Sequence, residues 1–322
     1  VEGIAQLDFT PQNRALPTDV LDQFLAQIAW TLREIAGIER MAVASDGVPV
    51  PLPKAANPAP LTAWSQYDPD LADGALPLLG VGDNGAPVSW DQGATSFVEQ
   101  LPGVAAEVAQ GPGTPLVAVI AADRRRLLIG GTADPGVWTT VPGSYPVRLS
   151  VDRRNRIWWP RADGGLGVTL AAPGADPRSI LLGELALPGS VVDAEVSRDG
   201  TRLAVVLATE DERRLAVGTL SGRVDAPQVG ALAYLGEESD VMDVSWRSAD
   251  EVTVLHSAEQ PRTTRYDQLG TRVVDVPTEN GSVLIADAPA ADTVVTLDTG
   301  RAVRLAPTGP VTLAGLTQAR YR

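Results

Sequence analysis

The strongest constraint on the fold is a strand-rich pattern that recurs every 40 to 50 residues from about residue 61 onward. Each unit contains a short, strongly apolar segment, followed by turn residues and further strand-like segments. The apolar segments begin at six positions separated by 40 to 49 residues: Leu76, Leu116, Ile157, Leu203, Val252 and Val294. Units of this length with four short strands are typical of β-propeller blades. The sequence therefore predicts a mainly β fold with a six-bladed β-propeller over residues 61–322, with seven or five blades as alternatives.

The composition supplies the turns that such a fold needs. Gly and Pro together account for 57 of the 322 residues, against an average near 12%. The clearest unit, residues 191–220, has three strand-like segments joined by turns at Asp199–Gly200 and around 210–212. At the C-terminus, residues 315–322 form a spare strand-like segment, GLTQARYR. We expect this segment to complete the first blade, because a propeller must close to remove unpaired sheet edges.

Residues 1–50 follow a different pattern, which includes the one convincing long helix of the chain. Apolar residues recur at three- and four-residue spacing between Val20 and Ile35 and form a stripe that must pack on something. Pro17 and Thr18 mark the start of this helix, and strand-like segments lie on either side of it. We expect residues 1–52 to form a partial α+β domain. Such a unit buries little surface alone, so we interpret it as the second part of a larger domain.

Residues 53–60 are rich in proline and lie between these two patterns. Proline favours an extended and fairly stiff chain. We therefore predict that residues 53–60 are a linker.

A G-x-G-x-x-G motif, formed by Gly80, Gly82 and Gly85, raises the question of nucleotide binding. A dinucleotide fingerprint needs a helix to begin at the last glycine, so that the helix N-terminus faces the phosphates. Here a strand pattern that includes Pro87 follows, and Asp83-Asn84-Gly85 is a strong hairpin signal. We expect the glycines to form a turn of the first blade and predict no nucleotide binding. The net charge of −14 argues against a nucleic-acid partner as well.

Residues that could carry catalysis are sparse. The chain has no Cys, which excludes disulfides, thiolate catalysis and cysteine metal sites. Its one histidine, His256, lies at the end of a predicted strand. A serine triad would depend on His256, and the sequence has no G-x-S-x-G elbow to supply the nucleophile. We interpret His256 as a structural strand-end residue and predict no catalytic residues.

The sequence also gives little support for a metal ion in the propeller channel. Asn84, Asn155 and Asn280, the asparagines of the propeller region, all lie in predicted turns. Residues 68–74, DPDLADG, faintly resemble a calcium loop, but Asp73 stands at the sixth position, where such a loop has glycine, and Leu79 at the twelfth, where it has glutamate. We therefore predict no metal site and no cofactor.

Trp158 and Trp159 are the candidate partner-binding residues. Adjacent side chains of a strand face opposite ways, so these two cannot enter the same layer between sheets. One of them is expected to lie partly exposed or at a seam between blades. An exposed aromatic residue on a propeller face would be a credible binding hot spot. Packing between the blades is the alternative interpretation.

Several motifs, taken in order, resemble a known family. VEGIAQLDFT and LDQFLAQIAWTLREIAGIERMAVASDGVPVPLP resemble the second part of a GerM-type (GerMN) domain, in which a helix packs on a small sheet. LPGVAAEVA, YPVRLSVDRRNRIWW and DAEVSRDGTRLAVV are similar to the propeller of the LpqB family of actinobacterial lipoproteins. The resemblance spans essentially the whole chain.

This resemblance implies a protein held by an N-terminal lipid at the outer face of the cytoplasmic membrane. It also implies a partner, the extracytoplasmic domain of a sensor histidine kinase, in two-component signalling linked to the cell wall and cell division. The signal peptide and the lipid-bearing Cys of the family are absent from this sequence, which we interpret as trimming or processing.

We therefore expect a non-enzymatic extracytoplasmic binding and regulatory protein. Two alternatives remain open. The first is a propeller hydrolase or lactonase-like enzyme with a metal ion in its channel. The second is a module that binds cell-wall glycan through exposed tryptophan side chains.

Overall fold

The computed structural model of the chain describes residues 3–9, 18–33, 35, 37–52, 55–67, 78–90, 94–96, 98, 101–111, 116–131, 136–143, 145, 148–170, 178–180, 187–223, 225–257, 261–267, 270–288 and 291–321. The chain divides into two compact units, Val1–Gly74 and Ala75–Arg322. We call them the first and second unit and describe each by itself.

The first unit is a small α+β structure built around one parallel strand pair. Strand β1 (Ile4–Phe9) pairs in parallel with β2 (Arg40–Ser45), and helix α1 (Thr18–Arg33) lies between them in the sequence. The short strands β3 (Val48–Pro49) and β4 (Ala59–Pro60) both pair antiparallel with β2. The apolar stripe of α1 packs on the sheet. Among the described residues, no helix is long and apolar enough to cross a membrane.

The linker prediction was wrong for residues 55–60, which are part of the first unit, as is the short 3₁₀ segment η2 (Leu61–Tyr67). The Asn57 side chain acts as a backbone substitute: it accepts a hydrogen bond from the Val43 amide at 3.0 Å and donates to the Val50 carbonyl at 2.9 Å. Trp64 is fully buried, and its indole N–H donates to Asp22 at 2.9 Å. The contacts of Asn57 and Trp64 hold this segment in the first unit. Its prolines, considered alone, indicate an extended linker. Residues 53–54 and 68–74 lie outside the described residues.

The second unit consists of antiparallel sheets in which consecutive strands pair with one another. The first two sheets contain β8 (Ala105–Gln110), β9 (Leu116–Ala121), β10 (Arg126–Gly131) and β11 (Trp138–Pro142), and then β12 (Ser150–Val151), β13 (Arg156–Pro160), β14 (Leu166–Leu170) and β15 (Arg178–Ile180). The next two contain β16 (Ser190–Val196), β17 (Arg202–Ala208), β18 (Arg213–Arg223), β19 (Ala226–Val229) and β20 (Ala233–Tyr234), and then β21 (Val241–Trp246), β22 (Glu251–His256), β23 (Arg262–Asp267) and β24 (Arg272–Pro277).

A seven-stranded sheet joins the two ends of the second unit. It runs through β25 (Ser282–Ala286), β26 (Val294–Leu297), β27 (Arg301–Ala306), β28 (Gly309–Tyr321), β5 (Leu78–Val81), β6 (Pro87–Trp90) and β7 (Ala94–Ser96). The first part of β28 pairs with β27 and its last part pairs with β5. The strand predicted at the C-terminus is thus present and completes the group β5–β7. β28 therefore belongs to two groups of four strands: its first part to the group with β25–β27, and its last part to the group with β5–β7.

The glycines of the G-x-G-x-x-G motif have structural roles in this sheet. Gly85 has a φ of +75°, and its amide donates to the Gly82 carbonyl in the turn between β5 and β6. A Cβ atom on Gly80 would lie 2.5 Å from the Thr317 carbonyl oxygen of β28. The hairpin prediction is confirmed, and Gly80 additionally allows the closing strand to approach β5.

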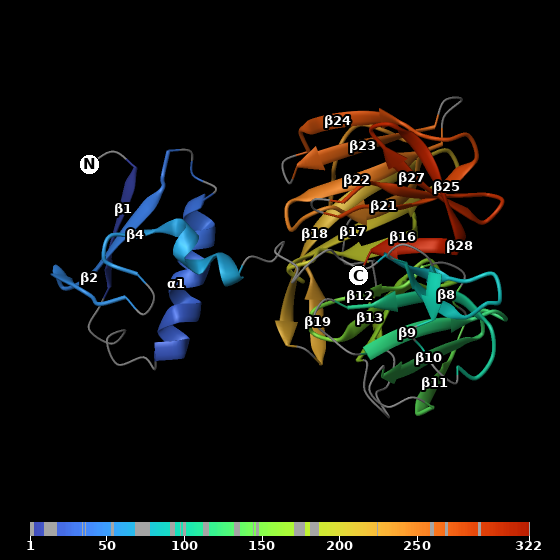
Figure 1. Cartoon of the computed structure of the whole chain (residues 1–322), viewed down its shortest axis with the longest axis horizontal. Coiled ribbons are helices and arrows are strands. Elements are labelled where there is room, and N and C mark those ends of the chain that lie inside the picture. The colour runs from blue at the N-terminus through green and yellow to red at the C-terminus, as the bar shows by residue number, and fades with distance from the viewer. Residues whose placement is uncertain are drawn as a thin grey trace. The chain divides into compact units, whose positions relative to one another are not determined.

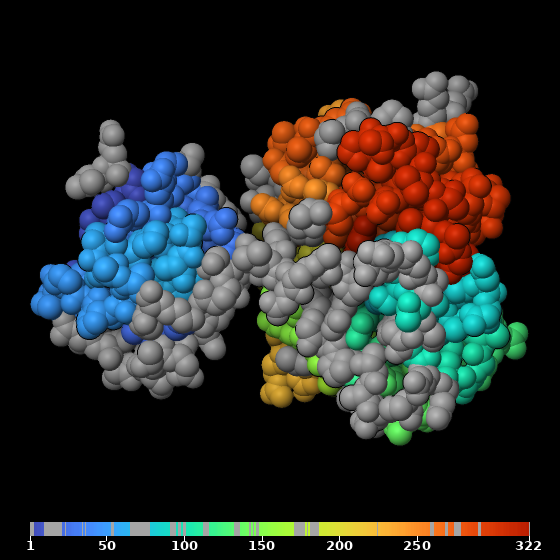
Figure 2. Space-filling model, viewed as in Figure 1, coloured from blue at the N-terminus to red at the C-terminus, as the bar shows by residue number. Residues whose placement is uncertain are grey.

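The hydrophobic core of the second unit lies between neighbouring sheets. Separate apolar clusters join β5 to the β8–β11 sheet, that sheet to β12–β15, and so on through β16–β20 to β21–β24. A further cluster joins β25–β28 to β5 and β6. The sheets follow one another around a centre (Figure 1), and the red residues of the last strands lie against the teal residues of the first ones (Figure 2). The innermost strands are β8, β12, β16, β21, β25 and the end of β28, and we call the space between them the channel.

Candidate functional site in the channel

The two tryptophans predicted to bind a partner are both buried. Trp158 is fully buried and Trp159 is 6% exposed. Their side chains face opposite ways, as expected: Trp158 packs against the β16–β20 sheet, and Trp159 lies in the cluster with β8–β11, with its ring 5.4 Å from that of Tyr145. Each therefore fills a seam between sheets, which confirms the packing alternative. The expected exposure is absent because both faces of β13 are covered by neighbouring sheets.

His256 and the three asparagines occupy the structural positions that the sequence predicts. His256 is fully buried at the end of β22, and its Nδ1 lies 2.7 Å from Asp240 Oδ1. Burial lowers the pKa of this imidazole, and the hydrogen bonds described for it involve no serine. Asn84, Asn155 and Asn280 all lie in turns. None of these four residues lines either of the channel cavities described below.

Acidic residues that the sequence analysis did not single out line the channel instead. The innermost strands β8, β16, β21, β25 and β28 each contain a β-bulge. On three of them the residue immediately after the bulge is acidic: Glu107 on β8, Asp193 on β16 and Asp243 on β21. All three side chains are at least 95% buried. A bulge re-aims a side chain, and here it accompanies a ring of carboxyl groups in the channel.

The two aspartates join neighbouring sheets. Asp193 Oδ2 accepts a hydrogen bond from the Val244 amide at 3.2 Å, and one sheet further on Asp243 Oδ2 accepts from the Ile285 amide at 2.5 Å. The position two residues later repeats this arrangement. The acceptors there bind the backbone amide of the next innermost strand in three pairs: Ser150 with Val196, Glu195 with Trp246, and Ser245 with Asp287. We call these five hydrogen bonds the ladder.

Arg148, two residues before β12, makes polar contacts with several strands of the channel, and we call it the hub. Its guanidinium lies 2.7 Å from Asp243 and donates to the carbonyls of Ile285 and Ala319 at 2.7 and 2.8 Å. Its Nε lies 3.6 Å from Glu107. One side chain thus contacts four other innermost strands. Burial alone would lower the pKa of Arg148, but the carboxylates of Asp243 and Glu107 raise it above its usual value, so the group stays charged.

Burial raises the pKa values of three acids in the channel. Burial, and then the charge of Asp243, raise the pKa of Asp193 well above its usual range, and the two carboxyl groups are hydrogen-bonded to each other. Burial also raises the pKa values of Glu107 and Glu195. Burial thus favours the neutral form of these carboxyl groups, and for Asp193 the neighbouring charge of Asp243 adds to this effect.

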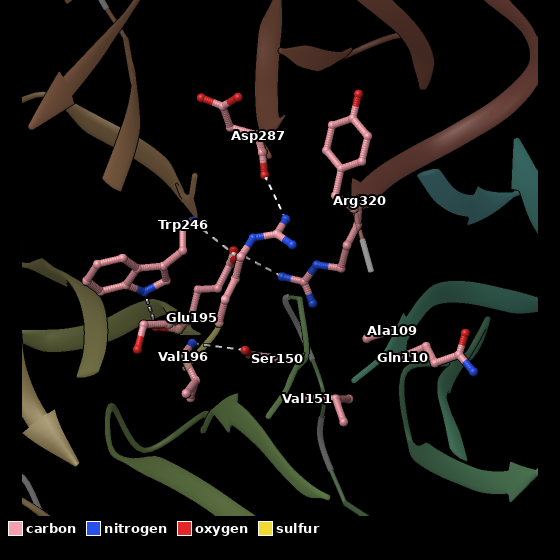
Figure 3. Close-up of a pocket in the computed structure, with 12 residues that line it drawn as sticks. Ala109, Gln110, Ser150, Val151, Glu195, Val196, Trp246, Asp287 and Arg320 are labelled. Atoms are coloured by element: carbon pink, nitrogen blue, oxygen red, sulfur yellow. Dashed lines mark hydrogen bonds and ion pairs between the residues drawn. The ribbon is translucent and has the colours of Figure 1, made fainter. Parts of the chain in front are cut away.

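At the end of the channel toward which β16 and β21 run, charged side chains, among them Glu195, Asp287 and Arg320, line the mouth (Figure 3). Glu195 and Arg320 point toward each other with 3.4 Å between their charged atoms. Asp287 accepts hydrogen bonds from Thr253 at 2.5 Å and from Arg247 at 2.8 Å, which fixes it to the β21–β24 sheet. The remaining space is about 40 Å³, room for one or two water molecules. This mouth cannot admit a substrate without side-chain movement.

The sequence does contain a signal for this site. Residues 191–196, VVDAEV, and 241–246, VMDVSW, place an aspartate, and a second acceptor two residues later, at the same spacing. Residues 147–151, VRLSV, repeat the pattern with Arg148 at the aspartate position. The most apolar strands are second in each sheet, so their spacing carries no information about the residues of the innermost strands. In the described part of the chain, no group of three or more His, Cys, Asp or Glu side chains could hold a metal ion.

Comparison with known proteins places these features in a family. A family model described as the lipoprotein LpqB β-propeller domain matches residues 85–309. The lipoprotein LpqB of Thermobifida fusca (strain YX) is 26% identical over 289 residues, a match that covers 73% of this chain and 45% of that protein. The chain thus spans less than half the length of this relative.

Solved structures agree with the fold. A chain from the crystal structure of a nidogen/laminin complex superimposes with a TM-score of 0.51 at 12% identity, covering 74% of this chain and 90% of that one. The β-propeller domain of Myceliophteria thermophila Cps50 (Swd1) gives a TM-score of 0.48 at 9% identity over 75% of this chain and 79% of that one. The family model over residues 85–309 confirms the propeller fold predicted from the sequence.

Proposed function

The chain belongs to the LpqB family of lipoproteins, and from that membership we propose that it is a non-enzymatic extracytoplasmic binding module of a regulatory lipoprotein. Its partner in this proposal is the extracytoplasmic domain of a membrane sensor histidine kinase, in two-component signalling linked to the cell wall and cell division. In the longer protein, an N-terminal lipid would hold the module at the outer face of the cytoplasmic membrane.

The observation that carries this proposal is the use of the channel acids. A general acid or base must reach the substrate within hydrogen-bond distance. Asp193, Asp243 and Glu195 are instead engaged with backbone amides of the neighbouring sheet. The mouth formed by Glu195 and Arg320 is closed to all but water-sized molecules. These three carboxyl groups therefore hold neighbouring sheets together, and in this proposal the turns on the two faces bind the partner protein.

The two alternatives from the sequence gain no observation in their favour. A channel enzyme would need a substrate-sized opening beside free acids. At the closed mouth about 40 Å³ is available, and at the other end of the channel, where the space is larger, Asp193 and Asp243 are engaged with backbone amides. Glycan binding by Trp158 or Trp159 would need an exposed ring, and both rings lie in the core between sheets.

Binding of the purified chain to the recombinant extracytoplasmic sensor domain, followed by surface plasmon resonance, tests the proposal. We expect saturable binding, and two charge-reversal variants report which face is used. Arg153→Glu changes an exposed residue in the turn after β12, and Arg125→Glu changes one in the turn between β9 and β10, at the opposite end of the strands. Reversing a charge at the rim of an interface lowers the association rate several-fold, so one variant should bind more slowly than the other.

The contrary result would be an absence of saturable binding to the sensor domain. Crosslinking in membranes of an actinobacterial host provides an independent check. Recovery of soluble cytoplasmic enzymes alone would contradict both the partner and the extracytoplasmic location.

A further inference from the structure

The opposite end of the channel differs from the closed mouth because it contains a larger, partly open cavity of about 240 Å³. The carboxyl groups of Glu107, Asp193 and Asp243 line it, together with the guanidinium of Arg148. A water molecule takes about 30 Å³ of liquid, so this space exceeds what a few bridging waters would need. It is large enough for a small ligand.

Glu107 has a carboxylate oxygen that lacks a hydrogen-bond donor in the described part of the chain, although the Arg148 charge is close to it. The side chain is 1% exposed, yet its Oε1 has no hydrogen-bond partner among the described residues. The nearest cationic atom, Arg148 Nε, lies 3.6 Å away, beyond hydrogen-bond distance. A buried carboxylate oxygen without a donor is costly. A ligand that brings N–H donors and a positive charge would satisfy this oxygen.

The rest of the lining restricts what kind of cation fits. Four apolar side chains, each less buried than the acids, surround the carboxyl groups: Val192, Met242, Val283 and Leu284. Val192, Met242 and Val283 are the bulge residues of their strands, and the first two immediately precede Asp193 and Asp243. These apolar side chains can pack against an alkyl chain, and the carboxyl groups can bind a cationic group at its end. A metal ion would gain nothing from the apolar side chains, which supply no ligand atoms.

We propose that this cavity binds an organic cation, with an aliphatic stem ending in a guanidinium or primary ammonium group, and that Glu107 is the residue that recognises the head. Two sources share this chemistry: a free alkyl amine or guanidine, and the Arg or Lys side chain of a bound protein segment. The site does not depend on the sensor partner proposed above, because small molecules probe it directly.

Binding at this site should displace a proton. The groups that face Asp193 are Asp243 on β21, Arg148 before β12 and Glu195 on its own strand, and burial keeps the pKa of Asp193 raised. Arg124 lies at the rim of the cavity. A cation beside Asp193 favours the ionised carboxylate and lowers its pKa. Cation binding should therefore release a proton, and its affinity should rise with pH.

Isothermal titration of the whole chain with agmatine tests the proposal, with cadaverine as the ammonium probe and 1-pentanol as the neutral probe. We expect saturable binding of a cationic probe and none of 1-pentanol. Glu107→Gln keeps the size of the side chain and should weaken binding at least about tenfold, because it leaves the buried cation without its counter-charge. Glu107→Asp, which keeps the charge, should retain part of the affinity.

The matched control is Asp225→Asn, an exposed acid in the turn between β18 and β19, which should bind agmatine as the unchanged chain does. Titrations in two buffers of different ionisation enthalpy report the released proton, a signal that a purely structural Glu107 would not give. A short peptide with one central Arg, compared with its citrulline counterpart, distinguishes a protein side chain from a free cation as the source. The proposal is overturned if neither agmatine, cadaverine nor the Arg peptide binds at millimolar concentration, or if Glu107→Gln binds them unchanged while folding normally.

Discussion

The two sides of the propeller are joined by different means. From β12 through β16 and β21 to β25, each innermost strand is linked to the next by the ladder, in which side-chain oxygens accept from backbone amides. From β25 through β28 to β5, continuous strand pairing and an apolar cluster take over. The first side uses a motif repeated within each sheet, whereas the second uses one strand with two partners. The ladder can lose one hydrogen bond and keep four, but closure rests on a single strand.

Removal of the hub should have the largest effect on the ladder side. Arg148→Ala leaves Asp243 and Glu107 buried without their counter-charge, and breaking a buried ion pair costs about 3 to 5 kcal/mol. We expect the free energy of unfolding in urea to fall by this amount. Arg148→Lys keeps the charge but loses donors to the Ile285 and Ala319 carbonyls, so its loss should be smaller. Equal stability of Arg148→Ala and the unchanged chain would show that the hub does not hold the sheets.

The closing strand should be sensitive to one methyl group. Gly80→Ala places a Cβ atom 2.5 Å from the Thr317 carbonyl oxygen, so β28 must shift, and such overpacking costs about 1 to 3 kcal/mol. Gly200→Ala is the matched control, since its Cβ would meet nothing within 4 Å and only its φ of +74° opposes the change. Thermal unfolding should show a larger loss for Gly80→Ala. A smaller loss than in Gly200→Ala would mean that β28 approaches β5 with room to spare.

A single ladder bond should matter less than either. Ser245→Ala removes the acceptor of the Asp287 amide and leaves a buried N–H unpaired, at a cost of about 1 to 2 kcal/mol. Ser221→Ala, at an exposed position of β18, should change stability by less than about 0.5 kcal/mol. Urea unfolding of the two variants measures the difference. If both lose equally little, the ladder is a consequence of the sheet arrangement and not its support.

The smallest effect concerns pH and the ladder acid Asp193. Its pKa in the folded chain is raised, so its contribution to stability is complete below the unfolded value of about 3.9 and is lost as pH rises through the folded value. Asp193→Asn can still accept from Val244 and donate to Asp243, so we expect a flatter fall of melting temperature between acidic and neutral pH. In contrast, the hydrogen bond from Arg161 lowers the pKa of the exposed Asp163, and Asp163→Asn should change the profile slightly in the opposite direction. An unchanged slope in Asp193→Asn would contradict the raised pKa of Asp193.

The sequence predicted features that depend on local repetition. The spacing of the apolar strands from Leu76 to Val294 anticipated the propeller, and Asp83-Asn84-Gly85 anticipated the first hairpin. Spare strand-like residues after Gly315 anticipated the closing strand, because a propeller without one would keep open edges. In each case the signal and the structure it specifies lie within a few residues of one another, or follow from the need to close the ring.

Features that depend on distant partners could not be predicted in this way. The prolines near Asn57 indicated a linker, and only the contacts of Asn57 with β2 and of Trp64 with Asp22 show that this segment belongs to the first unit. No residue pattern near Trp158 and Trp159 indicates that neighbouring sheets cover both faces of their strand. The channel site brings Glu107, Arg148 and Asp243 together from three strands, and pairing across more than 130 residues has no local signature.

The double partnership of β28 also has a kinetic consequence. Its residues 317–321 are synthesised after every other strand of the second unit, yet β5, more than 230 residues earlier, depends on them for its inner partner. Contacts across so long a loop form slowly. Until they form, β5 presents bare backbone groups that any neighbouring chain could pair with. The interval between emergence of β5 and arrival of its partner is therefore the period in which a chaperone would protect this protein most.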